Sequence, residues 1–244
     1  LRRPNRKIEK YTNNLHTNTK TKVIRSQFLL FKIDDLVDPE LIANNERLLR
    51  SEKIFHDARI LIDPIDENLV NVTVIVQDVW SLVPYVKYNS MKRFIVGIDQ
   101  INNKGSGNKF YNRIGYQTQF DGQKYGIWSG YSIPSIIPRS FIKADANLVS
   151  SFWQQMIGAK ISRDFLRPET KWAGSLEFNI SKNRIENYDN LDSLHTYRIG
   201  AGLADAWLGR SFAIRNTNSR IFLAARRRKI NYFNVPSDVD NGLY

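Results

Sequence analysis

Apolar and polar side chains alternate with a period of two in segment after segment of this chain from Trp80 onward. In residues 171–181, KWAGSLEFNIS, the pattern places Trp172, Leu176 and Phe178 on one side of an extended strand and polar side chains on the other. This alternation predicts a strand with one buried face. It leaves open what buries that face, because a strand on a soluble core and a strand against lipid show the same pattern.

Each segment has one apolar face and is about ten residues long, as membrane-spanning barrel strands are. Strands of soluble β-proteins are typically only ~5 to 6 residues long, so length favours lipid as the cover. A poorer strand is expected in residues 219–229. The apolar faces are Phe94, Val96 and Ile98; Phe110, Ile114, Tyr116 and Phe120; Tyr125, Ile127, Tyr131 and Ile133; Ile142, Ala144, Ala146 and Leu148; Trp153, Ile157, Ala159 and Ile161; and Tyr197, Ile199, Ala201 and Leu203. The residues expected to face lipid are Phe110, Ile114, Tyr116, Ile142, Leu148, Trp172, Leu176 and Phe178.

The composition excludes several classes of protein. With 42% hydrophobic residues, a mean hydropathy of -0.42 and no apolar run near the ~20 residues of a spanning helix, the chain is not a helical membrane protein. The absence of cysteine excludes disulfide frameworks, zinc–cysteine sites and thiol nucleophiles. A net charge of +12 and a pI near 9.8 are compatible with nucleic acid, an anionic membrane surface or acidic partners.

The sequence shows no catalytic constellation. Its histidines, His16, His56 and His195, are far apart, and none lies in a metal-ligand motif. The residues WSGYS do not match the nucleophile elbow of a serine hydrolase. We therefore predict that the chain is not an enzyme and uses no metal or other cofactor. The basic run at 226–229 is expected to divide between the two faces of its strand.

The first third of the chain has a different pattern. Asp38 is the expected N-cap of a helix over 39–50, with proline in the first helical position and apolar residues at helical spacing. A shorter helix fits residues 23–30, and two strands fit 55–63 and 69–78 with turn-forming residues between them. One earlier strand is expected in the polar lead-in.

This part of the chain, residues 14–80, resembles a POTRA domain, the polypeptide-transport-associated module that precedes outer-membrane barrels of the BamA type. The resemblance rests on DPELIANNERLLRSEKIFHDARILI followed by NLVNVTVIVQDVW, where helix, corner and two strands come in family order. It implies a basic lead-in over 1–13, a POTRA-like periplasmic domain over 14–80, and the first half of an outer-membrane β-barrel over 81–244. The implied fold class is an α+β POTRA domain followed by an antiparallel transmembrane β-barrel that is incomplete in this chain.

We expect the natural protein to continue beyond both ends of this sequence. The first residue, Leu1, is not methionine, and the last residues, SDVDNGLY, read as a loop. The chain would then contain eight or nine strands of a larger barrel.

A glycine motif marks the turn after the segment at 94–98. The residues VGIDQINNKGSGNKFYNRIGYQ resemble the early barrel hairpin of BamA-type and related bacterial surface-antigen proteins, in which a Gly-x-Gly turn opens the second strand. Gly105 and Gly107 hold these positions and permit the positive φ angles of a tight inter-strand turn. A phosphate cradle is disfavoured, because the P-loop spacing is absent and a strand follows rather than a helix.

Function in a protein of this type would lie in strand edges. An unpaired edge binds an incoming strand through main-chain hydrogen bonds and reads little of its sequence. Pro84 would interrupt hydrogen-bond donation from one expected edge. The candidate residues for binding a client strand are Arg59, Ile60, Leu61 and Ile62 at one edge, and Val83, Tyr85, Val86 and Lys87 at the other.

The resemblance implies a protein of the bacterial outer membrane, with its N-terminal domain in the periplasm, that assists insertion of outer-membrane proteins or translocation of polypeptide or lipid. The implied partners are outer-membrane lipids, unfolded outer-membrane clients or a secreted substrate, and accessory assembly subunits; no nucleic acid is expected. Two alternatives stay open. One is a pore or surface-receptor barrel without assembly activity, and the other is a soluble basic β-protein that binds nucleic acid.

Overall fold

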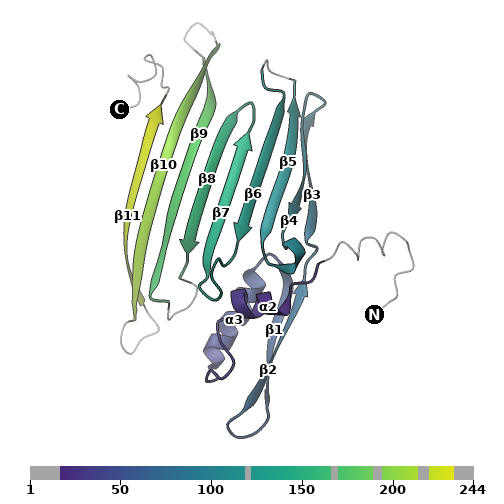
Figure 1. Cartoon of the computed structure of the whole chain (residues 1–244), viewed down its shortest axis with the longest axis vertical. Helices are drawn as coiled ribbons and strands as arrows, with labels where there is room; N and C mark the ends of the chain where they lie inside the picture. The colour runs from purple at the N-terminus through teal and green to yellow at the C-terminus, as the bar shows by residue number, and fades with distance from the viewer. Residues whose placement is uncertain (1–16, 119–121, 166–169, 189–193, 214–219, 234–244) are drawn as a thin grey trace, which may run out of the picture. The chain divides into compact units, whose positions relative to one another are not determined.

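The computed structural model of the chain describes residues 17–118, 122–165, 170–188, 194–213 and 220–233, and these residues form mostly antiparallel β-structure (Figure 1). A small sheet pairs β1 (Phe55–Pro64) with β2 (Val70–Asp78). Nine consecutive strands form a large sheet in chain order. They are β3 (Leu82–Ser90), β4 (Arg93–Gln100), β5 (Lys109–Gln117), β6 (Tyr125–Ile133), β7 (Ile142–Ser150), β8 (Gln154–Arg163), β9 (Trp172–Tyr188), β10 (Leu194–Ala213) and β11 (Arg220–Phe233).

The chain divides into two compact units. The first comprises the described residues up to Val83 with Asp99–Phe110 and Ile133–Ile142, and the second comprises Pro84–Ile98, Tyr111–Ser132 and the chain from Lys143 onward. Two connections of the large sheet thus belong to the first unit. Within that unit the Lys20 N–H donates to the Gly105 carbonyl at 3.0 Å, and the Arg139 N–H donates to the Ser26 carbonyl at 2.6 Å.

Both predicted helices of the first unit are present, and the longer one begins at the predicted residue. Helix α3 (Pro39–Ser51) confirms the expected helix, and the Asp38 carboxylate accepts a hydrogen bond from the Glu40 N–H at 2.9 Å, as an N-cap does. The shorter expected helix is a turn of α-helix, α2 (Thr21–Val23), followed by a π-helical turn, η1 (Ile24–Phe28). No helix in the described ranges is long and apolar enough to cross a membrane.

The core of the first unit lies between α3, η1 and the β1–β2 hairpin. Leu49 and Ile54 are completely buried there, and the Phe28 and Phe55 rings meet edge to face at 5.6 Å. The apolar face predicted for the first strand, with Ala58 and Ile60, packs into this core. The earlier strand expected in the lead-in lies outside the described residues.

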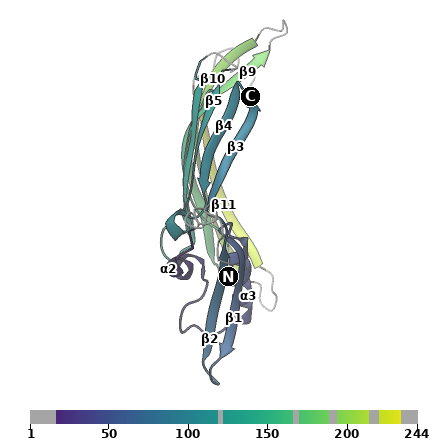
Figure 2. The same cartoon turned by 90° about the vertical axis from the view of Figure 1, so that its right-hand side faces the viewer.

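The large sheet is open within the described residues, since β3 and β11 each pair with one neighbour only. Figure 2 shows β3 at the edge of the sheet nearest the viewer. The sequence predicts strands of about ten residues, but β9, β10 and β11 contain 17, 20 and 14 residues. The poorer strand expected at 219–229 is the beginning of β11.

One predicted face is wrong. In register, Phe178 lies opposite Ala204 and Leu176 lies opposite Ala206, so the even-numbered residues of β10 share the face of Leu176 and Phe178. Leu203 lies opposite Asn179 and therefore points to the other face. The face predicted for this strand, Tyr197, Ile199, Ala201 and Leu203, thus lies on the polar side of the sheet. One residue of the predicted apolar faces, Phe120, lies outside the described residues.

Candidate functional site: an uncovered apolar face and its strand edges

The apolar face of the large sheet is uncovered. On β9, Leu176, Phe178 and Ile180 are 45%, 52% and 58% exposed, whereas Glu177 and Asn179 on the opposite face are half-buried. We call the side of Leu176, Phe178 and Ile180 the apolar face and the opposite side the polar face. In a soluble sheet the apolar side chains would be the covered ones, because burial of apolar surface drives folding. In this sheet the apolar side chains are the more exposed ones and the polar side chains are the more covered ones.

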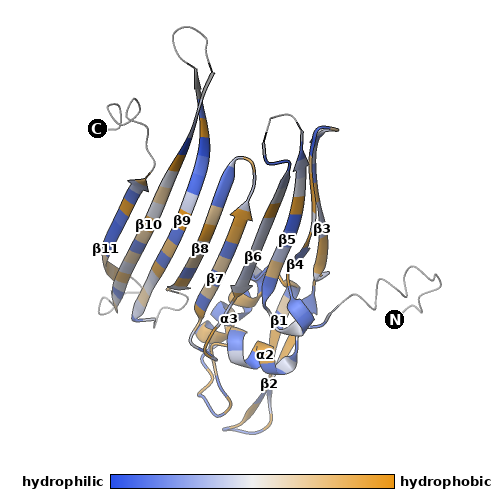
Figure 3. Cartoon of the chain, turned by 45° about the horizontal axis from the view of Figure 1, so that its top comes forward, coloured by the Kyte–Doolittle hydropathy of each residue, from blue (hydrophilic) through white to orange (hydrophobic). Residues whose placement is uncertain are grey.

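The same reversal extends over the neighbouring strands, along which hydrophilic and hydrophobic residues alternate (Figure 3). Exposed apolar side chains occur on strands from β4 to β10. They include Val96, Ile98, Ile114, Ile127, Leu148, Ile157, Ile161 and Leu208. Contiguous exposed apolar surface of this extent marks a membrane or interaction surface rather than a solvated one.

The residues predicted to face lipid divide into two groups. Ile114, Leu148, Trp172, Leu176 and Phe178 are exposed on the sheet. Phe110, Tyr116 and Ile142 are half-buried. The Tyr116 ring lies between two other rings, with centroids 5.7 Å from Phe94 and 5.5 Å from Tyr125. Contact of all eight residues with lipid remains a prediction.

Comparison with solved structures finds similar chains. The chain is similar to the crystal structure of BamA from Haemophilus ducreyi lacking POTRA domains 1–3, with 11% sequence identity and a TM-score of 0.45. The match covers 86% of this chain and 46% of that chain, so this sequence spans about half the length of the BamA chain. No family model matches the sequence, and no curated protein matches it.

A row of charged side chains crosses the polar face. Lys160, Glu177, Asp205 and Arg228 lie directly opposite one another on the successive strands β8, β9, β10 and β11. The Lys160 ammonium lies 3.2 Å from the Glu177 carboxylate. Asp205 is 4% exposed and accepts hydrogen bonds from Arg226 Nε at 2.9 Å and Arg228 Nε at 2.8 Å. The polar face thus holds paired charges, which suits contact with water rather than with a protein core.

The basic run at 226–229 divides between the two faces, as predicted. Arg226 and Arg228 join Asp205 on the polar face, whereas Arg227 and Lys229 lie opposite Ala206 and Ala204 on the apolar face. The small alanines leave room for the long stems of these cations to extend along the surface toward water. Ile221 and Leu223 are exposed on the same face of β11, so the cations interrupt the apolar face only in the second half of this strand.

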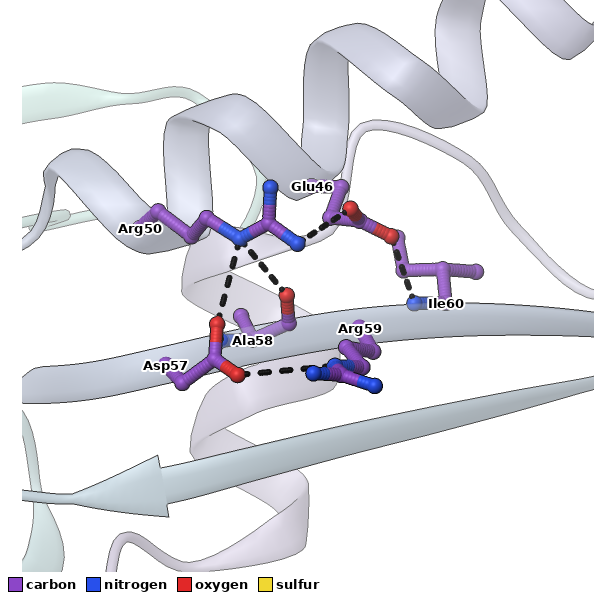
Figure 4. A network of polar contacts seen from close by, with 6 residues as sticks. All are labelled: Glu46, Arg50, Asp57, Ala58, Arg59 and Ile60. Carbon is purple, nitrogen blue, oxygen red and sulfur yellow. Dashed lines mark hydrogen bonds and ion pairs between the residues drawn. The ribbon is translucent and has the colours of Figure 1, made fainter.

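One of the two predicted strand edges is partly occupied by side chains of α3. The Glu46 carboxylate accepts a hydrogen bond from the Ile60 N–H at 2.9 Å, and Arg50 Nε donates to the Ala58 carbonyl at 3.0 Å (Figure 4). The Ala58 N–H donates to the Asp57 carboxylate at 2.9 Å. Ala58 and Ile60 are two residues apart, so their backbone groups point to the same side of β1, away from β2. Side chains of α3 thus contact this side of β1 at Ala58 and Ile60, and client binding at Arg59–Ile62 stays a prediction.

Replacement of Glu46 should reopen this edge. Glu46→Ala leaves the buried Ile60 N–H without an acceptor and removes one of the two carboxylates that pair with Arg50, whose guanidinium lies 2.6 Å from Glu46. An unsatisfied buried donor costs about 1–3 kcal/mol. We expect a lower melting temperature of the first unit and concentration-dependent self-association of the detergent-solubilised chain, measured by protease protection and sedimentation. Glu46→Gln keeps an acceptor for Ile60 and should behave close to wild type; equal self-association of the two variants would contradict the edge role.

Protonation of Asp57 should weaken the same network. The hydrogen bond from the Ala58 N–H, followed by the Arg50 side chain and the charges of Arg50 and Arg59, lowers the pKa of Asp57 in the folded chain. Because its pKa is lowered, the ionised Asp57 stabilises the fold at pH values above its ordinary pKa of about 4. This contribution is lost as the pH falls through the pKa of Asp57 in the folded chain. We expect faster proteolysis of the first unit below about pH 4. Asp57→Asn should lack that pH dependence.

The second predicted edge, Val83 to Lys87, lies on β3 at the end of the sheet order. Val86 and Tyr88 are 72% and 60% exposed on this strand. Within the described residues, β3 pairs with β4 only. The geometry therefore leaves one side of β3 open to another strand, and client binding there remains a prediction.

A groove that the sequence did not reveal runs beside β2 in the first unit. It measures about 1340 Å³ and is lined by the valines of β2 and by the loop between η1 and α3. In that loop Ile33 and Leu36 are 78% and 95% exposed. Within the described residues β2 pairs with β1 only. The groove thus combines an unpaired strand side with apolar surface.

The predicted turn glycines lie in the connection between β4 and β5, at φ angles of 71° for Gly105 and 76° for Gly107. Asn102 organises this connection: its carbonyl oxygen accepts from the Gly107 N–H at 2.9 Å, and its amide donates to the Thr19 hydroxyl at 2.7 Å. Thr19 in turn contacts the Asp78 carboxylate at the end of β2.

No cluster of metal-ligating side chains occurs in the described ranges.

Proposed function

We propose that this chain is part of an outer-membrane β-barrel protein in which the large sheet forms a section of the barrel wall and the first unit is a POTRA-like periplasmic domain. The observation that carries the proposal is the reversed exposure of the large sheet, with apolar side chains uncovered and charged side chains paired on the opposite face. Lipid covers such a face without loss of hydrogen bonds, because every backbone group pairs with a neighbouring strand.

Within this class we propose assistance in assembling outer-membrane proteins, or in translocating a polypeptide or lipid, through strand-edge templating. The open side of β3 and the apolar groove beside β2 support this role, since an added strand gains main-chain hydrogen bonds at one and apolar contacts at the other. The sequence resemblance of residues 14–80 to POTRA domains supports it as well. The proposed partners are outer-membrane lipids, unfolded clients or a secreted substrate, and accessory subunits, and no catalytic reaction is involved.

Membrane fractionation of the full-length protein followed by electrophoresis with and without heating tests the proposal. We expect partition to the outer membrane and faster migration of the unheated protein, followed by loss of client assembly on depletion. Stable pore conductance without any effect on client folding would replace templating by a pore function, which the charged polar face also permits. Solubility without detergent and identical migration would overturn the barrel and favour the basic nucleic-acid-binding alternative.

A further inference from the structure

Three cations follow the apolar face at one end of β9 and β10. Lys182 lies two residues beyond Ile180 and opposite Gly200, and Arg184 lies directly opposite Arg198. Their even numbers place all three side chains on the apolar face. Like charges directly opposite each other on one face of a sheet are destabilising, so the Arg184–Arg198 pair requires an explanation.

Arg184 is held in place by its surroundings. Its side chain is 19% exposed, its Nε lies 3.2 Å from the Glu186 carboxylate, and its guanidinium lies 4.1 Å from the centre of the Phe152 ring. Arg198 is exposed. Among the described residues no ion pair involves Arg198 or Lys182. Within the part of the chain that the structure describes, these three cations thus have one carboxylate partner, Glu186.

The position of the cluster matches the polar boundary of a bilayer. From Trp172 to Ile180 the apolar face of β9 covers nine residues, and a tilted transmembrane strand needs ~9–11 residues to cross the bilayer. An outer-membrane barrel carries an apolar band of ~25 Å flanked by headgroups. The cations begin just past this band, and at the other end of the band Arg210 lies 5.1 Å from the centre of the Trp172 ring.

We infer that Lys182, Arg184 and Arg198 bind a phosphate of a lipid headgroup in the leaflet at this end of the strands. The inference rests on the proposed membrane location. One phosphate accepts hydrogen bonds from both guanidiniums, which converts the repulsion between Arg184 and Arg198 into shared attraction for an anion. Lys182 adds a point charge on the side of the apolar band. By chain direction this end of the sheet is the end at which β3, β5 and β7 finish.

Lipid retention by the full chain tests the site. The chain is refolded in nanodiscs of phosphatidylcholine with a few per cent of bisphosphorylated lipid A, and bound lipid A is counted by native mass spectrometry after release into detergent. We expect Arg184→Gln with Arg198→Gln to weaken retention at least about tenfold, because two charge-assisted contacts are lost. Arg184→Lys with Arg198→Lys should lie between, because charge remains and bidentate geometry does not.

Arg227→Gln with Lys229→Gln is the control, since it removes the same charge from the same face on β11, level with Leu176 and Phe178 and away from the cluster. It should retain lipid A within about twofold of wild type. Equal losses in both double variants would show attraction by net charge alone and overturn the site. So would undiminished retention of lipid A from which both phosphates have been removed, or equal occupation by inorganic phosphate in phosphatidylcholine nanodiscs.

The gel-mobility shift of each refolded variant separates this inference from the proposed function. A wild-type chain that fails to insert overturns the barrel itself. A chain that inserts with its normal mobility shift but shows no preference for phosphorylated lipid overturns the phosphate site alone.

Discussion

Replacement of both Leu176 and Phe178 by arginine is expected to abolish insertion of the chain into bilayers. Both side chains are about half exposed near the middle of the apolar face of β9, and the residues opposite them on β10 are alanines. An arginine on the lipid side of a barrel strand costs ~2–4 kcal/mol at the bilayer midplane. Two such costs approach the whole folding stability of a typical domain, ~5–15 kcal/mol. Refolding into phospholipid vesicles, followed by the unheated gel shift, measures the loss.

Ser175→Arg with Asn179→Arg is the control, because these residues flank Glu177 on the polar face of the same strand. The same charge is added there at nearly the same depth, but into a surface that already carries paired ions. This variant should insert nearly as well as wild type. If both double variants insert equally, or if the Leu176 and Phe178 variant becomes freely soluble and folded, lipid does not cover the apolar face.

Alternation in the sequence was sufficient to find the strands but not always their faces. The segment around Leu176 has bulky apolar residues on one side and polar residues on the other, so its faces are unambiguous. In β10 the polar side carries Ile199 and Leu203, while the apolar side carries glycines and alanines. The larger apolar side chains of β10 therefore suggest the wrong face as the apolar one. Only the register with β9 shows which residues of β10 share a face with Leu176 and Phe178.

The contacts of α3 with the backbone of β1 could not be predicted from the sequence either. Glu46 and Arg50 are four residues apart on a helix, a spacing that reads as an ordinary surface ion pair. Their contacts with the backbone of Ala58 and Ile60 depend on how α3 packs over β1. Long-range geometry of this kind leaves no local signal. By contrast, Asp38 and Pro39 predicted the start of α3, because capping is a local property.

Gly105→Ala is expected to disrupt the first unit. The φ angle of 71° at Gly105 is unfavourable for alanine, and the added Cβ would collide with the backbone carbonyl oxygen of Asn18. A left-handed conformation alone costs roughly 1–2 kcal/mol, and the backbone collision must be relieved by moving a segment whose Lys20 N–H donates to the Gly105 carbonyl. We expect a loss of roughly 2–3 kcal/mol in total. Protease protection of the first unit during a thermal ramp measures it.

Gly202→Ala supplies the comparison, since no atom lies within 4 Å of the position that its Cβ would take. Gly202 lies opposite Ile180 on the apolar face, where an alanine adds apolar surface and restricts the unfolded chain. It should leave stability unchanged or slightly raised. The contrast separates a glycine required by backbone geometry from one that is not, because both substitutions add the same methyl group. Equal stability of the two variants would mean that the connection between β4 and β5 moves away from Asn18 at little cost, and that it does not pack as part of the first unit.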